Sequence, residues 1–389
     1  MDKPIFSSDF KLAIVGGGQL GKMMLYETRK WDIYTKVLDP NPEAPCKIAC
    51  NEFVQGDLQN YQDVMDFCQD ADVITIEIEA VNVAALSDLK EQGKKVYPQP
   101  ECLRIIQNKI SQKEFYKAQQ LPTADFTALV SKKELSAALE KQTINFPFVW
   151  KSATGGYDGR GVQVVKNQQQ IEELPDQSCL VEDLIDFSHE LSVIVARNES
   201  GEIRSYPVVE MEFHPTANQV EFVITPARID QNLQSKTKKL AEEVAQKMGI
   251  IGLLAVELFL TKDHQLLINE VAPRPHNSGH VSIEANYTNQ FEQYLRAILN
   301  LPLGATELKT AAVMVNLVGA ENHRGLPVYQ NMDQLLQMPG VTPHIYGKKQ
   351  TRPFRKMGHV NIIDTDVNKA REKAKEVKSK IRVISHDKS

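Results

Sequence analysis

A glycine-rich segment lies between two apolar runs of the sequence. Residues 154–161 hold four glycines, and the apolar runs cover residues 148–151 and 162–165. Glycine has no Cβ, so backbone N–H groups in such a loop can approach a phosphate closely. The segment lacks the Gly-Lys-Ser/Thr ending and the following helix of a P-loop. We therefore interpret it as a hairpin flap over a triphosphate, with Lys151 supplying positive charge.

Two apolar runs farther along the chain each carry a carboxylate. Glu257 lies in residues 255–260 and Glu270 in residues 266–271, and a short polar segment between the runs predicts an antiparallel hairpin. Carboxylates on buried strands need cations. The oxygens of Glu257, Glu270 and the Asn269 amide suit Mg²⁺ that bridges phosphates. The alternative is that both glutamates pair with arginine or lysine.

Composition limits the classes of protein that the sequence allows. A chain of 389 residues is expected to form two or three domains, and its net charge of −5 leaves no global basic field for nucleic acid. No apolar stretch near the start or elsewhere reaches membrane-spanning length, so we expect a cytoplasmic protein without a membrane partner. The five cysteines are scattered, which favours reduced thiols over a zinc site.

Strand and helix patterns alternate over the first 100 residues and predict a doubly wound α/β domain. Residues 108–142 favour helices on both sides of Pro122. Residues 146–271 mix strands with an amphipathic helix over 233–248, which is an α+β pattern. The rest begins with a strand at 312–317 and ends in a charged helix at 366–380. The predicted domains are 1–107, 108–305 with the flap at 152–161, and a small β-rich domain at 306–389.

The turn after the first predicted strand also fits a different class of protein. Gly16, Gly18 and Gly21 follow that strand, and Asp39 ends the next one, which nearly satisfies the dinucleotide fingerprint. An NAD-dependent oxidoreductase is therefore the alternative. Against it, Asp39 precedes a proline-rich stretch, and a redox function leaves the flap unexplained. In either case, a helix start of this kind captures an anion.

The order of these chemical groups resembles the ATP-grasp superfamily. More narrowly, residues 16–21, 154–161 and 269–280 (NEVAPRPHNSGH) resemble the 5-(carboxyamino)imidazole ribonucleotide synthetase family of purine biosynthesis, over nearly the whole chain. The resemblance implies a pre-ATP-grasp domain, a central ATP-grasp domain and a homodimer. It implies an ATP-dependent ligase that uses Mg²⁺ and bicarbonate to carboxylate 5-aminoimidazole ribonucleotide through carboxyphosphate. Another ATP-grasp ligase or transformylase, or a nucleotide-binding chain without catalysis, is the remaining alternative.

The same resemblance implies residues for ATP and for its metal ion. Glu257 and Glu270 would hold Mg²⁺, and lysines, the flap and the segment after Glu182 would contact the phosphates, ribose and adenine. The predicted ATP-binding residues are Lys109, Lys151, Gly156, Tyr157, Asp158, Gly159, Arg160, Gly161, Val162, Glu182, Asp183, Leu184, Ile185, Glu190, His214, Asn269 and Glu270.

For the ribonucleotide, the resemblance implies contacts from the glycine turn, the loop after Glu270 and the basic segment 346–359. That segment has five lysines and arginines, one histidine and no acid, and its proposed register among Lys348, Lys349, Arg352 and Arg355 stays open. The alternative for the basic segment is a solvated surface, as for most basic runs. The alternative for Arg274 is a local ion pair without a catalytic role. The predicted substrate-binding residues are Gly18, Gln19, Leu20, Glu79, His276, Asn277, Lys348 and Arg355, and the predicted catalytic residues are Arg274, Tyr157, Asp158 and His276.

Overall fold

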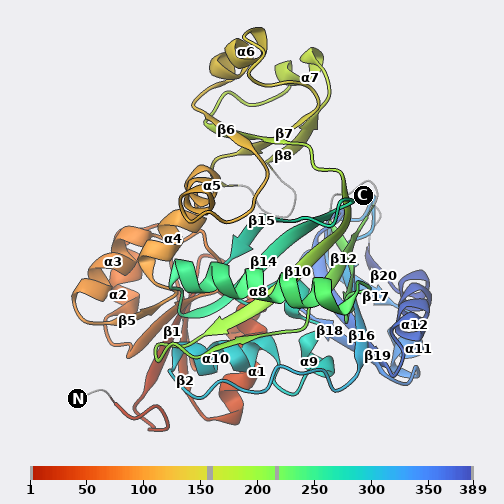
Figure 1. Cartoon of the computed structure of the whole chain (residues 1–389). Helices are drawn as coiled ribbons and strands as arrows, with labels where there is room; N and C mark the ends of the chain where they lie inside the picture. Colours follow the sequence, from red (N-terminus) through yellow and green to blue (C-terminus); the bar gives the residue numbers. More distant parts are fainter. Residues whose placement is uncertain (1–2, 156–160, 215–218, 387–389) are drawn as a thin grey trace.

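The structure is a computed structural model that describes residues 3–155, 161–214 and 219–386. It contains a parallel sheet near the N-terminus, a small antiparallel sheet and a long antiparallel sheet. In Figure 1 the small sheet lies at the top, the N-terminal region at the lower left and the C-terminal region at the right of the long sheet. This arrangement confirms the predicted combination of α/β and α+β regions.

The N-terminal region is a five-stranded parallel sheet with the order β3-β2-β1-β4-β5. The chain moves outward on one side of β1 and then returns to its other side, so the order reverses between β1 and β4. Ligands of doubly wound sheets bind beyond the carboxyl ends of the strands at such a reversal. The elements are β1 (Lys11–Val15), α1 (Gln19–Lys30), β2 (Tyr34–Asp39), η1 (Pro45–Ile48), β3 (Glu52–Gln55), α2 (Tyr61–Cys68), β4 (Val73–Ile76), α3 (Val83–Glu91), β5 (Lys95–Tyr97) and α4 (Pro100–Ile106).

The small sheet has the order β6-β9-β7-β8. Its strands β7 and β8 pair antiparallel on either side of the glycine-rich segment, from Phe148 opposite Val165 to Lys151 opposite Val162, as predicted. The mostly helical prediction for residues 108–142 is wrong at β6, because the apolar residues of this short strand pair with β9. The elements are α5 (Lys109–Ala118), β6 (Phe126–Leu129), α6 (Lys132–Glu140), β7 (Phe148–Ser152), β8 (Val162–Val165), α7 (Gln168–Glu172) and β9 (Cys179–Asp183).

The long sheet contains the predicted hairpin of β14 and β15 at one edge. Helix α8 packs on β10 and β14, and it begins where the Asp230 side chain accepts a hydrogen bond from Leu233 N–H and ends at Gly249. The elements are β10 (Phe187–Arg197), β11 (Ile203–Ser205), β12 (Val209–Phe213), β13 (Val220–Thr225), α8 (Gln231–Met248), β14 (Gly252–Thr261), β15 (Leu266–Ala272), η2 (Asn277–Gly279), α9 (Ser282–Ala285) and α10 (Gln290–Ile298).

The C-terminal strands continue the long sheet, because β13 pairs with β16 and β16 with β19. Strands β18 and β19 form a hairpin whose connection is the basic segment, and α12 packs on β16 and β19. The elements are β16 (Ala311–Val318), β17 (Pro327–Gln330), α11 (Met332–Leu336), β18 (Val341–Ile345), β19 (Lys356–Asp364), α12 (Val367–Lys380) and β20 (Arg382–Ser385).

Helix α10 joins the N-terminal and central regions. It packs against α1, and the Tyr294 hydroxyl is 2.7 Å from Thr75 Oγ1 on β4. Apolar residues of α1, α10 and β14 belong to one buried cluster. This packing fixes the glycine turn relative to the loop after β15. Within the described ranges, every helix is too short or too polar to cross a bilayer.

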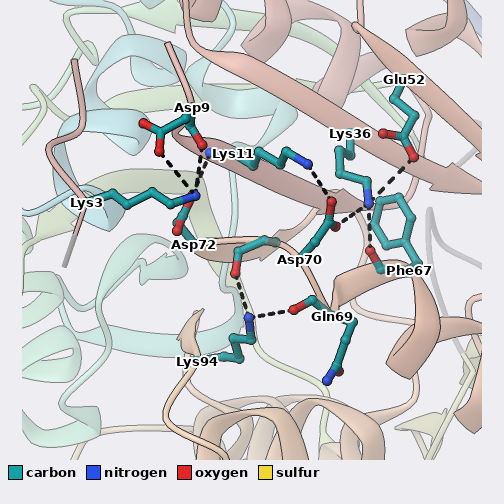
Figure 2. Close-up of polar contacts among 11 residues, drawn as sticks. Lys3, Asp9, Lys11, Lys36, Glu52, Phe67, Gln69, Asp70, Asp72 and Lys94 are labelled. Atoms are coloured by element: carbon teal, nitrogen blue, oxygen red, sulfur yellow. Dashed lines mark hydrogen bonds and ion pairs between the residues drawn. The ribbon is translucent and has the colours of Figure 1, made fainter. Parts of the chain in front are cut away.

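A network of lysines holds the loop before β4 at the amino-terminal edge of the parallel sheet (Figure 2). Lys11 Nζ lies 2.6 Å and buried Lys36 Nζ 2.5 Å from Asp70, while Lys94 donates to the carbonyl oxygens of Gln69 and Ala71. The two ammonium groups hold the pKa of Asp70 down to about 2. Because this edge lies opposite the glycine turn, we interpret the network as a stabilising feature.

Asp70→Asn should lower the free energy of unfolding by about 1 kcal/mol at pH 7, since 48% exposure of the Asp70 side chain leaves the pair partly screened. The pKa of Asp70 is about 2 in the folded protein, below the unfolded value of about 3.9, so its ionised form stabilises the fold above about pH 3.9. The difference in the free energy of unfolding between wild type and variant should therefore narrow as the pH falls from about 4 to 2. Urea denaturation measures it, with exposed Asp66→Asn as the control, and a difference independent of pH would contradict the assignment.

Candidate active site

Side chains of the small and long sheets meet at Lys151. Its ammonium group lies 2.9 Å from Glu182 Oε2 at the end of β9 and donates to Asn269 Oδ1 on β15 at 2.8 Å. Lys151 and Glu182 are both buried. Three residues predicted to bind ATP are thus in direct contact, and a lysine bridges the two sheets between which the nucleotide is expected.

Helix α5 brings two lysines to this contact. The Asn108 side chain caps the helix, and Lys109 N–H donates to Ala153 O at 2.8 Å, which ties the helix start to the end of β7. Lys113, one turn later on the same face, lies 3.2 Å from Glu182. Burial lowers the pKa of Lys113 to about 8, against the opposing effect of Glu182. Lys113 was not predicted, although its spacing from Lys109 was a usable signal.

Glu257 and Glu270 are opposite each other in the register of β14 and β15. Lys109 Nζ lies 2.5 Å from Glu270 Oε2 and lowers the pKa of this carboxyl. Burial and the charge of Glu270 raise the pKa of Glu257. The alternative of pairing with lysine thus applies to Glu270, whereas among the described residues Glu257 forms no ion pair with a lysine or arginine. The two neighbouring carboxylates and the Asn269 oxygen are a donor set that fits Mg²⁺.

The residues predicted for the nucleoside end of ATP include a half-buried acid and an exposed apolar side chain. Burial raises the pKa of Glu190 on β10 to about 7, and Lys151 opposes this shift. Leu184, just after β9, is 43% exposed, so it offers an uncovered apolar side chain next to buried Glu182. His214 follows β12, and its ring lies 6.2 Å from that of Phe354 in the C-terminal region.

The flap residues predicted to contact ATP are only partly described. Gly161 has a φ of 72°, a left-handed conformation that favours glycine, and its carbonyl accepts a hydrogen bond from Ser152 N–H at 2.8 Å. Val162 begins β8 directly after it. The predicted contacts of Gly156, Tyr157, Asp158, Gly159 and Arg160 lie outside the described residues.

The glycine turn after β1 already holds two carboxylates of its own chain. Asp39 Oδ2 accepts a hydrogen bond from Gly17 N–H at 2.7 Å, and Glu77 Oε1 accepts one from Leu20 N–H at 3.0 Å. A Cβ on Gly18 would be 2.5 Å from Glu77 Oε1. Asp39 is therefore bound to the turn itself, which argues against its role as the ribose ligand of a dinucleotide. Leu20 N–H, predicted to meet the substrate phosphate, is bound to Glu77 in this structure.

The loop after β15 connects the carboxylate pair to the N-terminal region. Arg274 Nε lies 2.9 Å from Glu79 Oε2, and His276 Nε2 lies 3.4 Å from Glu257 Oε1. The buried Gln290 amide accepts a hydrogen bond from His276 N–H and donates to His276 O, both at 2.9 Å. The structure thus brings Arg274, His276 and Glu79 together with the predicted metal ligands.

Asn277, in the same loop, contacts the C-terminal region, which also carries the basic segment. The Asn277 and Asn316 amides exchange two hydrogen bonds of 2.9 Å. Lys348 Nζ donates to Lys356 O at 2.8 Å, whereas Arg355 donates to Gln350 O within its own segment at 2.6 Å. Lys348 is thereby fixed at the start of β19, and the Arg355 contact gives no separate support to its predicted role.

Electrostatic effects on buried acids show which cations surround the site. Burial raises the pKa of Glu77, and the charges of Arg274 and Lys348 oppose the rise. Lys356 similarly lowers the pKa of Glu257. Glu77 and Lys356 were not assigned roles from the sequence. The position of Glu77 directly after β4, at the carboxyl edge of the parallel sheet, was a usable signal for its role. Lys356 was one of five lysines and arginines in the basic segment, so the sequence did not single it out.

Family models match most of the chain. The ribonucleotide synthetase preATP-grasp domain matches residues 10–107, the ATP-grasp domain residues 114–291, and the phosphoribosylaminoimidazole carboxylase C-terminal domain residues 312–373. The N5-carboxyaminoimidazole ribonucleotide synthase of Bacillus subtilis is 36% identical, over 93% of this chain and 94% of that protein. The phosphoribosylaminoimidazole carboxylase of Saccharomyces cerevisiae is 38% identical over 90% of this chain, which spans only 63% of that longer protein.

Solved structures give the same relationship. The N5-carboxyaminoimidazole ribonucleotide synthetase of Thermotoga maritima is 40% identical, with a TM-score of 0.89 over 97% of this chain and 100% of that one. The enzyme of Aspergillus clavatus, in complex with ADP and 5-aminoimidazole ribonucleotide, is 29% identical, with a TM-score of 0.86 over 96% of this chain and 99% of that one. The likeness therefore extends over all three regions of the fold.

Glu182→Gln should destabilise the nucleotide-free protein by about 3 kcal/mol, because it leaves buried Lys113 and Lys151 without their shared carboxylate. Chemical denaturation at pH 7 measures the loss. The adjacent substitution Asp183→Asn, at an exposed position, should change stability by less than about 0.5 kcal/mol. Equal stability of the two variants would show that Glu182 does not balance the lysines.

Proposed function

We infer that the chain, which belongs to the N5-carboxyaminoimidazole ribonucleotide synthase family and is an ATP-dependent ligase, carboxylates 5-aminoimidazole ribonucleotide with ATP and bicarbonate. The products are N5-carboxyaminoimidazole ribonucleotide, ADP and phosphate. The observation that carries this proposal is the contact of His276 with Glu257, since it joins the loop beside the glycine turn to the carboxylates of the ATP site. Mg²⁺, a homodimer and a cytoplasmic location remain predictions.

The ATP end supplies positive charge and a dry environment. Lys109 and Lys151 would bind the phosphates, and Glu190 would accept hydrogen bonds from the ribose hydroxyls beside Leu184. Mg²⁺, held by Glu257 and Glu270, would neutralise charge on the phosphate oxygens. Phosphoryl transfer depends mainly on such positioning and charge compensation. If Lys109 exchanged Glu270 for a phosphate, the Glu270 carboxylate would become available to the metal ion.

Bicarbonate would lie between the γ-phosphate and the loop after β15. A bicarbonate oxygen forms a bond to the γ-phosphorus while the bond from this phosphorus to the ADP oxygen breaks, which gives carboxyphosphate. Arg274 and His276 are positioned to stabilise the negative charge during this step. The exocyclic amine of the ribonucleotide then forms the new carbon–nitrogen bond, phosphate leaves, and the amine loses a proton. Tyr157 and Asp158 are proposed to orient that amine or to accept its proton, and the flap as a whole to exclude water.

The ribonucleotide phosphate would bind where the glycine turn faces the basic segment. Gly18 and Gln19 lie at the start of α1, where backbone N–H groups and the helix dipole favour an anion. Lys348 directly follows Gly347, which passes close to Lys22 in the first turn of α1. Glu79 and Asn277 complete the proposed set from the two neighbouring loops.

A phosphate-release assay with ATP, Mg²⁺ and bicarbonate tests the proposed function. We expect strong stimulation by 5-aminoimidazole ribonucleotide. Stimulation by glycinamide ribonucleotide with formate instead would assign the chain to a transformylase activity. Saturable binding of NADH, followed by nicotinamide fluorescence, would support the oxidoreductase alternative.

Glu270→Ala should reduce ATP turnover by about a hundredfold or more, because a proposed metal ligand and the partner of Lys109 are both lost. Glu270→Gln preserves the shape of the side chain and should show a comparable loss while remaining folded. Steady-state phosphate release measures turnover, and circular dichroism checks the fold. Asp263→Ala, in the turn of the same β14–β15 hairpin, is the matched control. Unchanged phosphate release by both Glu270 variants would refute the metal assignment.

Lys348→Ala and Arg355→Ala should each raise the KM for the ribonucleotide by about tenfold, since each removes a charged hydrogen-bond donor from a phosphate. The KM for ATP should stay unchanged. Lys349→Ala, at an exposed neighbouring position, is the control that tests the register of the segment. If the Lys348 and Arg355 variants instead alter only the dependence on ATP, the basic segment has been assigned to the wrong substrate.

A further inference from the structure

One buried lysine of the N-terminal region lacks the carboxylate partner that the other buried lysines have. Among the described residues the buried lysines are Lys22, Lys36, Lys113 and Lys151. The last three have an aspartate or glutamate oxygen within 3.2 Å. Lys22 is 6% exposed and instead donates to two main-chain oxygens, Ile345 O at 3.1 Å and Tyr346 O at 3.2 Å. Within the described part of the chain, this ammonium group makes no ion pair.

Lys22 connects the two segments proposed to bind the phosphate, which are the start of α1 and the basic segment. Its Cα lies in the first turn of α1, and helical side chains lean toward the amino-terminal end of their helix. Its two hydrogen bonds hold the end of β18, directly before Gly347 and Lys348. A Cβ on Gly347 would be 3.2 Å from the ammonium nitrogen, so this turn passes close to it. Lys22 therefore joins the helix behind the glycine turn to the segment that carries Lys348.

The charges around this position are unbalanced in the free protein. Carbonyl oxygens solvate an ammonium group through their dipoles but provide no opposite net charge, and a buried ion without a counter-ion is unfavourable. The nearby acids are already engaged, because Glu77 accepts a hydrogen bond from Leu20 N–H and Asp39 accepts one from Gly17 N–H. Within the described ranges, the positive charge of Lys22 has no carboxylate paired with it. A phosphate monoester with nearly two negative charges would balance it.

We propose that Lys22 is a further specificity-determining residue for the 5′-phosphate of the ribonucleotide. It supplies positive charge to the phosphate site and holds residues 345–347 so that Lys348 faces the glycine turn. The inference rests on the proposed function, because it takes the anion to be the phosphate of the ribonucleotide substrate.

Two substitutions separate the charge of Lys22 from its hydrogen bonds. Lys22→Gln retains an amide donor but removes the charge, and Lys22→Arg retains both. We expect Lys22→Gln to raise the KM for 5-aminoimidazole ribonucleotide by about tenfold or more, with kcat and the KM for ATP within about twofold of wild type. Lys22→Arg should keep the KM for the ribonucleotide near the wild-type value. Lys30→Gln, at the end of the same helix, is the matched control and should leave all three constants unchanged.

The outcomes distinguish this inference from the proposed function. If the wild-type protein shows no turnover that depends on the ribonucleotide, the proposed function fails. If wild type is active and Lys22→Gln has an unchanged KM for the ribonucleotide, the inference is overturned. A parallel loss of kcat and of affinity for ATP would also overturn it, because that result indicates a structural role between domains. Thermal unfolding of each variant verifies the fold. If Lys22→Gln does not fold, Lys22→Arg provides the test. A raised KM for the ribonucleotide in the arginine variant would then overturn the inference.

Discussion

The balance of buried charge constrains the whole site. Glu182 compensates two lysines from different elements and Lys109 compensates Glu270, while burial and the charge of Glu270 raise the pKa of Glu257. Uncompensated ions in such surroundings are strongly unfavourable, so each group depends on the position of its partner. A nucleotide with a divalent cation fits this arrangement, because phosphates can take over the lysines and the metal ion can take over the carboxylates. Nucleotide binding would then give each lysine and carboxylate a new partner of opposite charge, so that no charge is left uncompensated.

The fold brings these partners together through register and capping. Pairing of β14 with β15 sets Glu257 beside Glu270, and the Asn108 cap starts α5 where Lys109 reaches across to β15. The loop after β15 is then held by the Gln290 amide at the start of α10. Since α10 also packs on α1 and contacts β4, the same helix locates both the loop and the glycine turn. The residues proposed for ATP and those proposed for the ribonucleotide are therefore positioned by one connected framework.

The sequence predicts the elements with strong local patterns. The hairpins around the glycine-rich segment and between β14 and β15 alternate apolar runs with turn residues, and α8 has regular helical spacing with a capping aspartate. The strand β6 escaped prediction, because four residues between helices carry too little periodicity and pair with β9 far along the chain. The contacts of Lys113 and Glu77 depend on such distant pairing. The residue types indicated phosphate and metal-ion chemistry, whereas the fold was needed to show which side chains contact one another.

Glu77 explains how the start of α1 remains stable without a substrate. Unpaired N–H groups and the helix dipole make this end positive, and the Glu77 carboxylate binds Leu20 N–H there. Burial raises the pKa of Glu77, so the ionised form depends on Arg274, Lys348 and this amide. A phosphate that arrives at the turn competes with Glu77 for the same positive surroundings. Because the fold already provides an internal anion, a neutral ligand would gain little electrostatic binding energy at the turn. Only a group with more negative charge than one carboxylate gains such energy, either by displacing Glu77 or by binding beside it.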